Sequence, residues 1–162
     1  MELSFFVIFV ILNQHSPVTA NLACESDQSE NDGSCYYFSE SESNFATSKS
    51  SCEDLGMHLV SIGSQEEQNF MQSSISSGNK ELWIGLSRLT WIDGSSLDYN
   101  NFANGEYDNY FASQIFDDGG ICFEMTELQS QWFDSSCSGA SYYICENEIE
   151  DNAGTYRKLS IN

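Results

Sequence analysis

Six cysteines constrain the fold of this 162-residue chain more than any other feature. They are Cys24, Cys35, Cys52, Cys122, Cys137 and Cys145, and the last three have the spacing C-x14-C-x7-C. No pair has the C-x-x-C spacing, which argues against zinc binding and thiol redox chemistry. An even number of cysteines in an exported chain favours three disulfides, but the spacing alone does not select the pairing.

The first twenty residues predict export. Residues Leu3 to Leu12 form an apolar run too short to span a bilayer, and the small residues Val18-Thr19-Ala20 follow. This order is typical of a secretory signal peptide over residues 1–20, although Glu2 occupies the usual basic region. An N-terminal core strand is the alternative, but the pattern offers it no partner. We therefore expect a secreted, extracellular protein without membrane insertion.

The chain is strongly acidic, with a formal charge of −20, or −19 once Glu2 is removed with the leader. Such a charge disfavours nucleic acid and anionic membranes as partners. It leaves cations, basic proteins and uncharged ligands. The simplest alternative is a solvated acidic surface without a specific partner.

Two helices are predicted in the first half of the chain. Phe45, Cys52 and Leu55 recur at helical spacing, and Gly56 supplies the stop. Ser64 begins a second helix as N-cap, with Glu67 reaching back in a capping box, and Gly78 ends it. The predicted strands are Ser34 to Glu40, His58 to Ile62, Leu82 to Leu86, Leu89 to Ile92 after a tight Ser87-Arg88 link, Ile121 to Met125 and Ser141 to Cys145. Residues 93–120 show no period, and a loop of this length suggests function.

Four features occur together in this sequence: the segment Trp83-Ile84-Gly85-Leu86, the order of the two helices, the six cysteines, and Trp132 before Cys137. As a set they resemble a C-type lectin-like domain over Cys24 to Glu146. The resemblance implies an α+β fold with two helices on small antiparallel sheets and a long loop region. It also implies the pairs Cys24–Cys35, Cys52–Cys145 and Cys122–Cys137, the first typical of the long form of the domain. The expected organisation is a leader at 1–20, the domain at 24–146 and a flexible acidic tail at 147–162.

The resemblance also implies a calcium and sugar site. Calcium takes six to eight oxygen ligands, which sugar-binding members supply from a loop tripeptide and a Trp-Asn-Asp motif. Here the tripeptide is Glu106-Tyr107-Asp108, and Trp132-Phe133-Asp134 keeps Asp134 but replaces the amide. The family's proline is cis, whereas a cis bond before Tyr107 would cost about 2.5–4 kcal/mol, so we expect a trans bond. Gly120 stands where a further Glu is usual. The candidate metal ligands are therefore Glu106, Asp108 and Asp134, with Asp117 and Asp118 as replacements.

The loop is also aromatic. Tyr99 and Phe102 match core positions of the family, so we expect them to pack inward. Tyr107, Tyr110 and Phe111 fall where a ring could stack on a sugar or a protein partner. Inward packing of the whole loop is the alternative. The candidate ligand-binding residues are Glu106, Tyr107, Asp108, Asn109, Tyr110 and Asp134.

Nothing in the sequence favours an enzyme. The one histidine after the leader, His58, lies in an apolar strand, and paired cysteines leave no thiolate nucleophile. The leading hypothesis is recognition of a carbohydrate with calcium dependence weakened or lost. The alternatives are a calcium-independent protein-binding module that uses the aromatic loop, and an acidic binder of divalent cations or mineral surfaces.

Overall fold

The computed structural model describes residues 23–75, 79–105, 121–128 and 130–149, and these form the predicted α+β fold. The helices are α1 (Phe45–Asp54) and α2 (Gln65–Ser74). The strands are β1 (Ser29–Asn31), β2 (Ser34–Phe38), β3 (His58–Leu59), β4 (Glu81–Ser87), β5 (Thr90–Trp91), β6 (Ile121–Thr126), β7 (Trp132–Ser136) and β8 (Tyr142–Glu148). No helix of the described part is long and apolar enough to cross a membrane.

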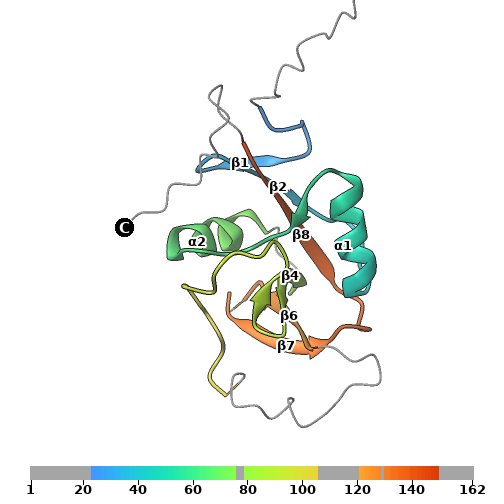
Figure 1. The fold of residues 1–162 in the computed structure, drawn as a ribbon, viewed down its shortest axis with the longest axis vertical. Coiled ribbons are helices and arrows are strands. Elements are labelled where there is room, and N and C mark those ends of the chain that lie inside the picture. Colours follow the sequence, from blue (N-terminus) through green and yellow to red (C-terminus); the bar gives the residue numbers. More distant parts are fainter. Residues whose placement is uncertain (1–22, 76–78, 106–120, 129, 150–162) are drawn as a thin grey trace, which may run out of the picture.

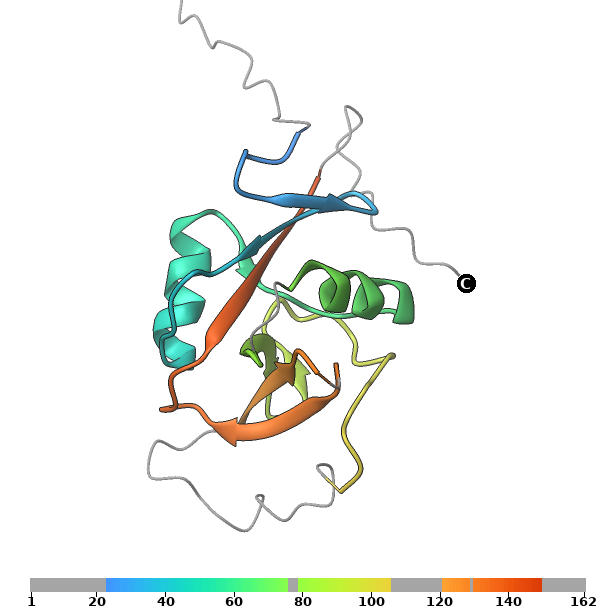
Figure 2. The same cartoon turned by 180° about the vertical axis from the view of Figure 1, so that it is seen from behind.

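Strand β8 connects the two parts of the sheet. The strand order is β1-β2-β8-β4-β6-β7, with β3 paired to β8 and β5 paired to β4. The pairs are antiparallel except for β4 and β8, which run parallel through Leu82–Tyr142 and Trp83–Tyr143. In both views β8 runs between α1 and α2, and β6 and β7 lie at the far end from β1 (Figures 1 and 2).

Helix α1 forms where the spacing predicts, but Leu55 lies just after its last residue and is 49% exposed, so it is not part of the buried face. Asn44 caps its start, with its side-chain oxygen accepting from the backbone N–H of Thr47 at 2.9 Å. Phe45, Ser48 and Cys52 make up its buried face. Gly56 follows the last turn with a φ of 72°, a left-handed conformation that glycine adopts without strain.

Helix α2 begins as predicted but ends earlier. Ser64 Oγ accepts from the N–H of Glu67 at 3.1 Å, whereas the Glu67 carboxylate reaches Gly63, one residue before the cap, at 2.8 Å. The prediction that the helix continues to Gly78 was wrong. Ile75 already has an extended backbone, with ψ at 121°, so α2 stops at Ser74.

Several strand boundaries also differ from the predictions. No strand was predicted before Ser34, but residues 29–31 form β1, which pairs with β2 through a turn at Asp32-Gly33, both with positive φ. Strand β3 is shorter than His58 to Ile62. The link between β4 and β5 is Arg88-Leu89, so Leu89 belongs to the turn. Such offsets arise because strand ends are set by partners in the sheet rather than by local composition.

The domain extends beyond Glu146, where the tail was predicted to begin. Strand β8 continues to Glu148. Ile149 is buried, and its N–H donates to the carbonyl of Gly33 at 2.7 Å. The expected tail at 147–162 is therefore wrong for residues 147–149, and residues 150–162 lie outside the described part.

The Trp83-Ile84-Gly85-Leu86 segment forms the centre of the core. Trp83, Ile84 and Leu86 are completely buried, and the Trp83 indole N–H donates to the carbonyl of Ser43 at 2.8 Å. Gly85 has no room for a side chain, since a Cβ there would lie 2.4 Å from the carbonyl oxygen of Leu59. The glycine thus lets β4 approach the chain around β3, where its N–H donates to the carbonyl of Val60 at 2.7 Å.

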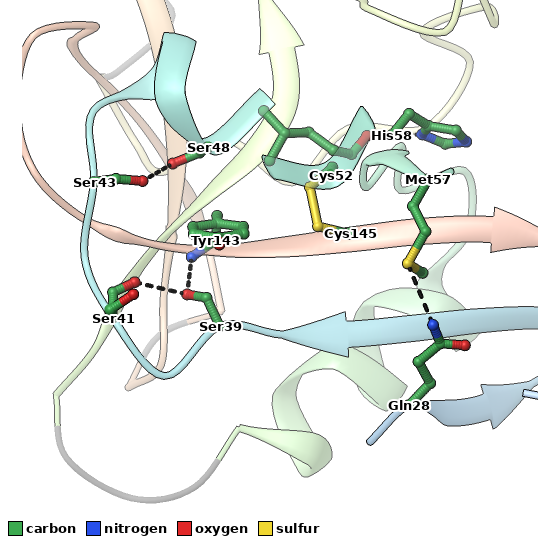
Figure 3. The surroundings of a disulfide bond; sticks show 11 residues. Gln28, Ser39, Ser41, Ser43, Ser48, Cys52, Met57, His58, Tyr143 and Cys145 are labelled. Atoms are coloured by element: carbon green, nitrogen blue, oxygen red, sulfur yellow. Dashed lines mark hydrogen bonds between the residues drawn. A yellow bond between two sulfur atoms is a disulfide. The ribbon is translucent and has the colours of Figure 1, made fainter. Parts of the chain in front are cut away.

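All six cysteines are paired, as Cys24–Cys35, Cys52–Cys145 and Cys122–Cys137, which are the pairs that the resemblance implies. Cys52 and Cys145 are both fully buried and join α1 to β8 (Figure 3). Beside this bridge, Ser39 Oγ accepts from the N–H of Tyr143 at 2.9 Å and fixes the start of β8 against the end of β2 (Figure 3).

Candidate functional site

Of the predicted site residues, the structure describes only Asp134. The others lie outside the described residues: Glu106, Tyr107, Asp108, Asn109, Tyr110, Asp117 and Asp118. Gly120 lies outside them as well. The structure therefore describes one part of the candidate site. We call this part the floor, and it consists of β7 and residues 101–103, which lead into the loop.

Strand β7 carries the Trp132-Phe133-Asp134 motif. In the antiparallel pairing with β6, Asp134 lies opposite Phe123 and Phe133 lies opposite Glu124. Because side chains alternate along a strand, Trp132 and Asp134 share one face and Phe133 occupies the other. Trp132 is completely buried, whereas Phe133 and Asp134 are half-buried.

Trp132 is held rigidly beneath the site. Its indole N–H donates to Oε1 of Gln68 on α2 at 2.8 Å, and the Gln68 amide contacts the sulfur of Met125. Three aromatic rings meet the indole edge to face: Trp91, Tyr99 and Phe102, with centroid distances of 5.4, 5.8 and 5.3 Å. The inward packing predicted for Tyr99 and Phe102 is confirmed.

The described start of the long loop is attached to β7 through backbone hydrogen bonds. Trp132 N–H donates to the carbonyl of Asn101 at 2.9 Å, and Ala103 N–H donates to the carbonyl of Trp132 at 3.0 Å. The Asn101 side chain also donates to the carbonyl of Ser130 at 2.6 Å. Residues 101–103 thus run beside Trp132, with an isolated parallel bridge between Phe102 and Trp132.

Asp93 stabilises the turn at which the loop begins. Its Oδ1 accepts from the N–H and the hydroxyl of Ser95 at 2.8 and 2.7 Å. Burial alone would raise the pKa of Asp93, but these two hydrogen bonds, with smaller contributions from Ser61 and His58, lower it. Asp93 therefore serves the turn and is ionised at neutral pH.

Calcium requires more oxygen ligands than the floor offers. The motif contributes the carboxylate of Asp134, while Phe133 presents a hydrocarbon ring at the position of the amide. Glu124, opposite Phe133, is buried; burial and then the nearby Glu81 charge raise its pKa, although a hydrogen bond from Ser141 acts against this. Among the described residues, no three His, Cys, Asp or Glu side chains form a metal-binding group. The other candidate ligands, Glu106, Asp108, Asp117 and Asp118, lie outside the described residues.

A buried cluster of two carboxylates, Glu67 and Glu146, was not predicted from the sequence. The Tyr36 hydroxyl lies 2.9 Å from Oε1 of Glu67 and 3.3 Å from Oε1 of Glu146, both buried. Backbone N–H groups of Gly63 and Ser61 donate to the other oxygens of Glu67 and Glu146. Burial, then Glu146 and Glu67, strongly raise the pKa of Tyr36, so its hydroxyl remains a donor. The only sequence signal was an acid, Glu146, directly after the last cysteine of an apolar strand.

Gln68, which holds the Trp132 indole, was also not predicted from the sequence. It lies one turn before Met71 on the buried face of α2, where a polar residue requires a partner. That spacing could have indicated a buried hydrogen bond, but not that the partner is Trp132, which is 64 positions away.

Comparison with known proteins agrees with the resemblance to a C-type lectin-like domain. The model of the Lectin C-type domain matches residues 41–147. The chain is 34% identical to C-type lectin domain family 4 member M of Symphalangus syndactylus over 134 residues, which cover 78% of the chain and 30% of that protein. It is 32% identical to the CD209 antigen of Papio hamadryas over 136 residues, covering 78% of the chain and 36% of that protein. The chain thus spans about a third of the length of these relatives.

Solved structures agree. The carbohydrate-recognition domain of the human scavenger receptor C-type lectin matches with a TM-score of 0.69 and 32% identity, covering 78% of this chain and 99% of that one. The corresponding domain of cow CD23, solved in the presence of a GlcNAc2Man3 oligosaccharide, matches with a TM-score of 0.67 and 28% identity, covering 78% and 96%. The cysteine pairs, the buried Trp83-Ile84-Gly85-Leu86 strand and these matches together show that the chain belongs to the C-type lectin domain family.

Proposed function

We propose that this chain is an extracellular protein that recognises carbohydrate with calcium dependence weakened or lost. The observation that carries the proposal is the geometry of Trp132-Phe133-Asp134 on β7. The strand and its buried tryptophan provide a rigid floor, as recognition requires, while Phe133 removes an oxygen from the set that calcium needs. Family membership supports the carbohydrate, because several relatives are named as carbohydrate-recognition domains.

The proposed ligand contacts come from the floor and from the loop that leaves it. Asp134, Glu106, Asp108 and Asn109 would hydrogen bond sugar hydroxyls, and Tyr107 and Tyr110 would stack on the apolar face of a sugar ring. Residues 101–103 support this arrangement because their pairing with Trp132 places the start of that loop directly beside β7. In this proposal, any calcium that binds uses Glu106, Asp108 and Asp134, supplemented by Asp117 or Asp118.

Export belongs to the same proposal. A leader at 1–20 would direct the chain to an oxidising compartment, where three disulfides form and persist. The family fold is a recognition domain rather than a typical enzyme, so the proposed role is binding without catalysis.

The first experiment is the melting temperature of the oxidised protein with calcium, magnesium or chelator. A site filled at about a hundred times its dissociation constant stabilises a fold by roughly 2.7 kcal/mol. We expect calcium to raise the melting temperature by much less than a stabilisation of this size would. A full rise that magnesium does not reproduce would contradict the proposed loss of calcium dependence.

The second experiment is glycan-array binding with calcium and with chelator. We expect binding that survives chelator and falls in Glu106→Ala and Asp134→Ala, with Glu30→Gln on exposed β1 as a charge-matched control. No glycan bound in either buffer would overturn the carbohydrate assignment. In that case, chelator-insensitive binding of an extracellular protein that is lost in Tyr110→Ala would identify the protein-binding alternative. Uptake on calcium phosphate that follows total charge would identify the mineral binder.

A further inference from the structure

Two grooves lie beside each other where β4 begins, and they share Asn79, Lys80 and Glu81. The first has a volume of about 310 Å³ and is also lined by Thr126, Glu127, Leu128 and Phe133. The second has a volume of about 360 Å³ and is also lined by Glu42, Ser141 and Tyr142. We call the pair the twin groove. Its two parts are at the lower end of the size range of ligand pockets, about 300–1,000 Å³.

The first groove offers an apolar contact. Leu128 is 71% exposed, more than Leu55 at 49% and Leu89 at 38%, the other exposed large apolar side chains of the described part. A single exposed leucine is ordinary, but Leu128 shares its groove with the ring of Phe133. The Thr126 hydroxyl in the same groove is buried and has no hydrogen-bond partner among the described residues. A ligand in this groove therefore gains apolar burial against Leu128 and Phe133.

The second groove is acidic, although it contains a lysine. The Lys80 ammonium lies 4.7 Å from the centroid of the Tyr142 ring, a cation–π contact that holds it against the side of the groove. Glu42 and Glu81 are exposed on the same groove. The twin groove as a whole therefore holds more carboxylates than ammonium groups.

Glu127 adds a third carboxylate in a fixed position. Its Oε2 accepts from the N–H of Lys80 at 3.2 Å, and its own N–H donates to the carbonyl of Lys80 at 3.0 Å. Negative charge thus accumulates around Glu81, on a chain whose total charge is already −20.

We propose that the twin groove binds a segment of a protein partner in which a lysine or arginine lies two residues from a large apolar residue. In an extended segment these two side chains point to the same side, about 7 Å apart. The basic side chain lies beside Glu42 and Glu81 in the second groove, and the apolar one covers Leu128 and Phe133 in the first. This interaction uses none of the loop residues 106–120. Of the floor of the proposed carbohydrate site it uses only Phe133, which lies on the opposite face of β7 from Trp132 and Asp134.

The probe is a fluorescein-labelled tripeptide, Lys-Ala-Leu, blocked at both ends, with Glu-Ala-Leu and Lys-Ala-Ser as control peptides. Anisotropy measures the affinity, and amide NMR shifts of the full oxidised protein locate the contact. We expect saturable binding that weakens with added salt, with shifts confined to the residues of the twin groove. Both control peptides should bind at least about fivefold more weakly.

Matched variants separate the grooves from the general acidity of the chain. Glu81→Gln and Leu128→Ser should each weaken binding by about fivefold. Glu30→Gln removes one charge from β1, and Leu55→Ser removes an exposed leucine after α1, so both should leave the affinity unchanged. Circular dichroism confirms that each variant is folded.

Three results would overturn the proposal. The first is the absence of saturable binding at millimolar peptide. The second is equal binding of Glu-Ala-Leu. The third is shifts spread over the whole acidic surface, with Glu30→Gln as damaging as Glu81→Gln. None of these results bears on glycan binding, which is measured independently.

Discussion

The indole N–H of Trp132 donates a 2.8 Å hydrogen bond to Oε1 of Gln68, joining the floor of the candidate site to helix α2. Both residues are buried, at 0% and 1% exposure. A buried donor and acceptor satisfy each other here, and neither can turn to water if the other is removed. The position of the floor therefore depends on this contact with helix α2.

Removing that acceptor should destabilise the domain. Gln68→Ala leaves the indole N–H of Trp132 unsatisfied and opens a small cavity, for an expected loss of about 1–3 kcal/mol in the free energy of unfolding. Chemical denaturation measures the loss. Gln72→Ala, one turn later on the exposed face of α2, is the control and should change stability little. Equal losses in the two variants would contradict the role assigned to Gln68.

The Tyr36 hydroxyl should stabilise the fold through Glu67 and Glu146. Tyr36→Phe keeps the ring, which packs on Phe70 at a centroid distance of 5.1 Å, but removes the donor between two buried carboxylates. We expect a loss of about 1–3 kcal/mol in denaturation experiments. Tyr37→Phe, at the next and half-buried position of β2, should cost much less. A Tyr36→Phe protein as stable as Tyr37→Phe would mean that the carboxylates do not depend on this hydroxyl.

Much of the fold could be predicted from the sequence because it depends on local signals. Asn44 and Ser64 cap helices through neighbours three residues away, and Gly56 ends a helix through its own φ. The disulfide pairing came from the resemblance, not from spacing. What could not be predicted depends on partners distant in sequence, such as Gln68 with Trp132 or Tyr36 with Glu146.

The candidate site could be predicted only in part for a related reason. The motif residues Trp132 and Asp134 were predicted, but no strand was predicted at Trp132–Ser136. Only the pairing of β7 with β6 shows that these two side chains share a face. The pattern does not show that residues 101–103 pair with β7, since an isolated run of three residues has no period. The roles of Glu106, Asp108 and their neighbours in the loop remain predictions.

Glu124 should make stability depend on pH. Its pKa in the folded state lies above the ordinary 4.5, with burial as the largest cause. For an acid with a raised pKa, the favourable contribution is present below the unfolded value and is lost as pH rises through the folded value. Glu124→Gln, which keeps the shape without the charge, should therefore melt above the natural protein at pH 7, and the difference should shrink towards pH 4.

Melting curves at several pH values measure this difference. Glu81→Gln is the matched variant, because removing the nearby charge should lower the pKa of Glu124 and give a smaller effect in the same direction. A gap between Glu124→Gln and the natural protein that widens in acid would show that the ionised carboxylate is favoured in the fold.

Gly85 should tolerate no side chain. A Cβ at this position would lie 2.4 Å from the carbonyl oxygen of Leu59 and 3.0 Å from that of Val60, both backbone atoms that cannot rotate away. Gly85→Ala should therefore push β4 away from β3 and cost at least about 1–3 kcal/mol, as overpacked cores do. Denaturation curves, or the yield of oxidised protein if the variant folds poorly, measure the effect. Gly63→Ala is the control, because its nearest contact would be the Glu67 side chain at 3.8 Å, and it should remain close to the natural protein. Equal stability of the two variants would show that β4 can shift without loss, and that the glycine of this core segment is not required by packing.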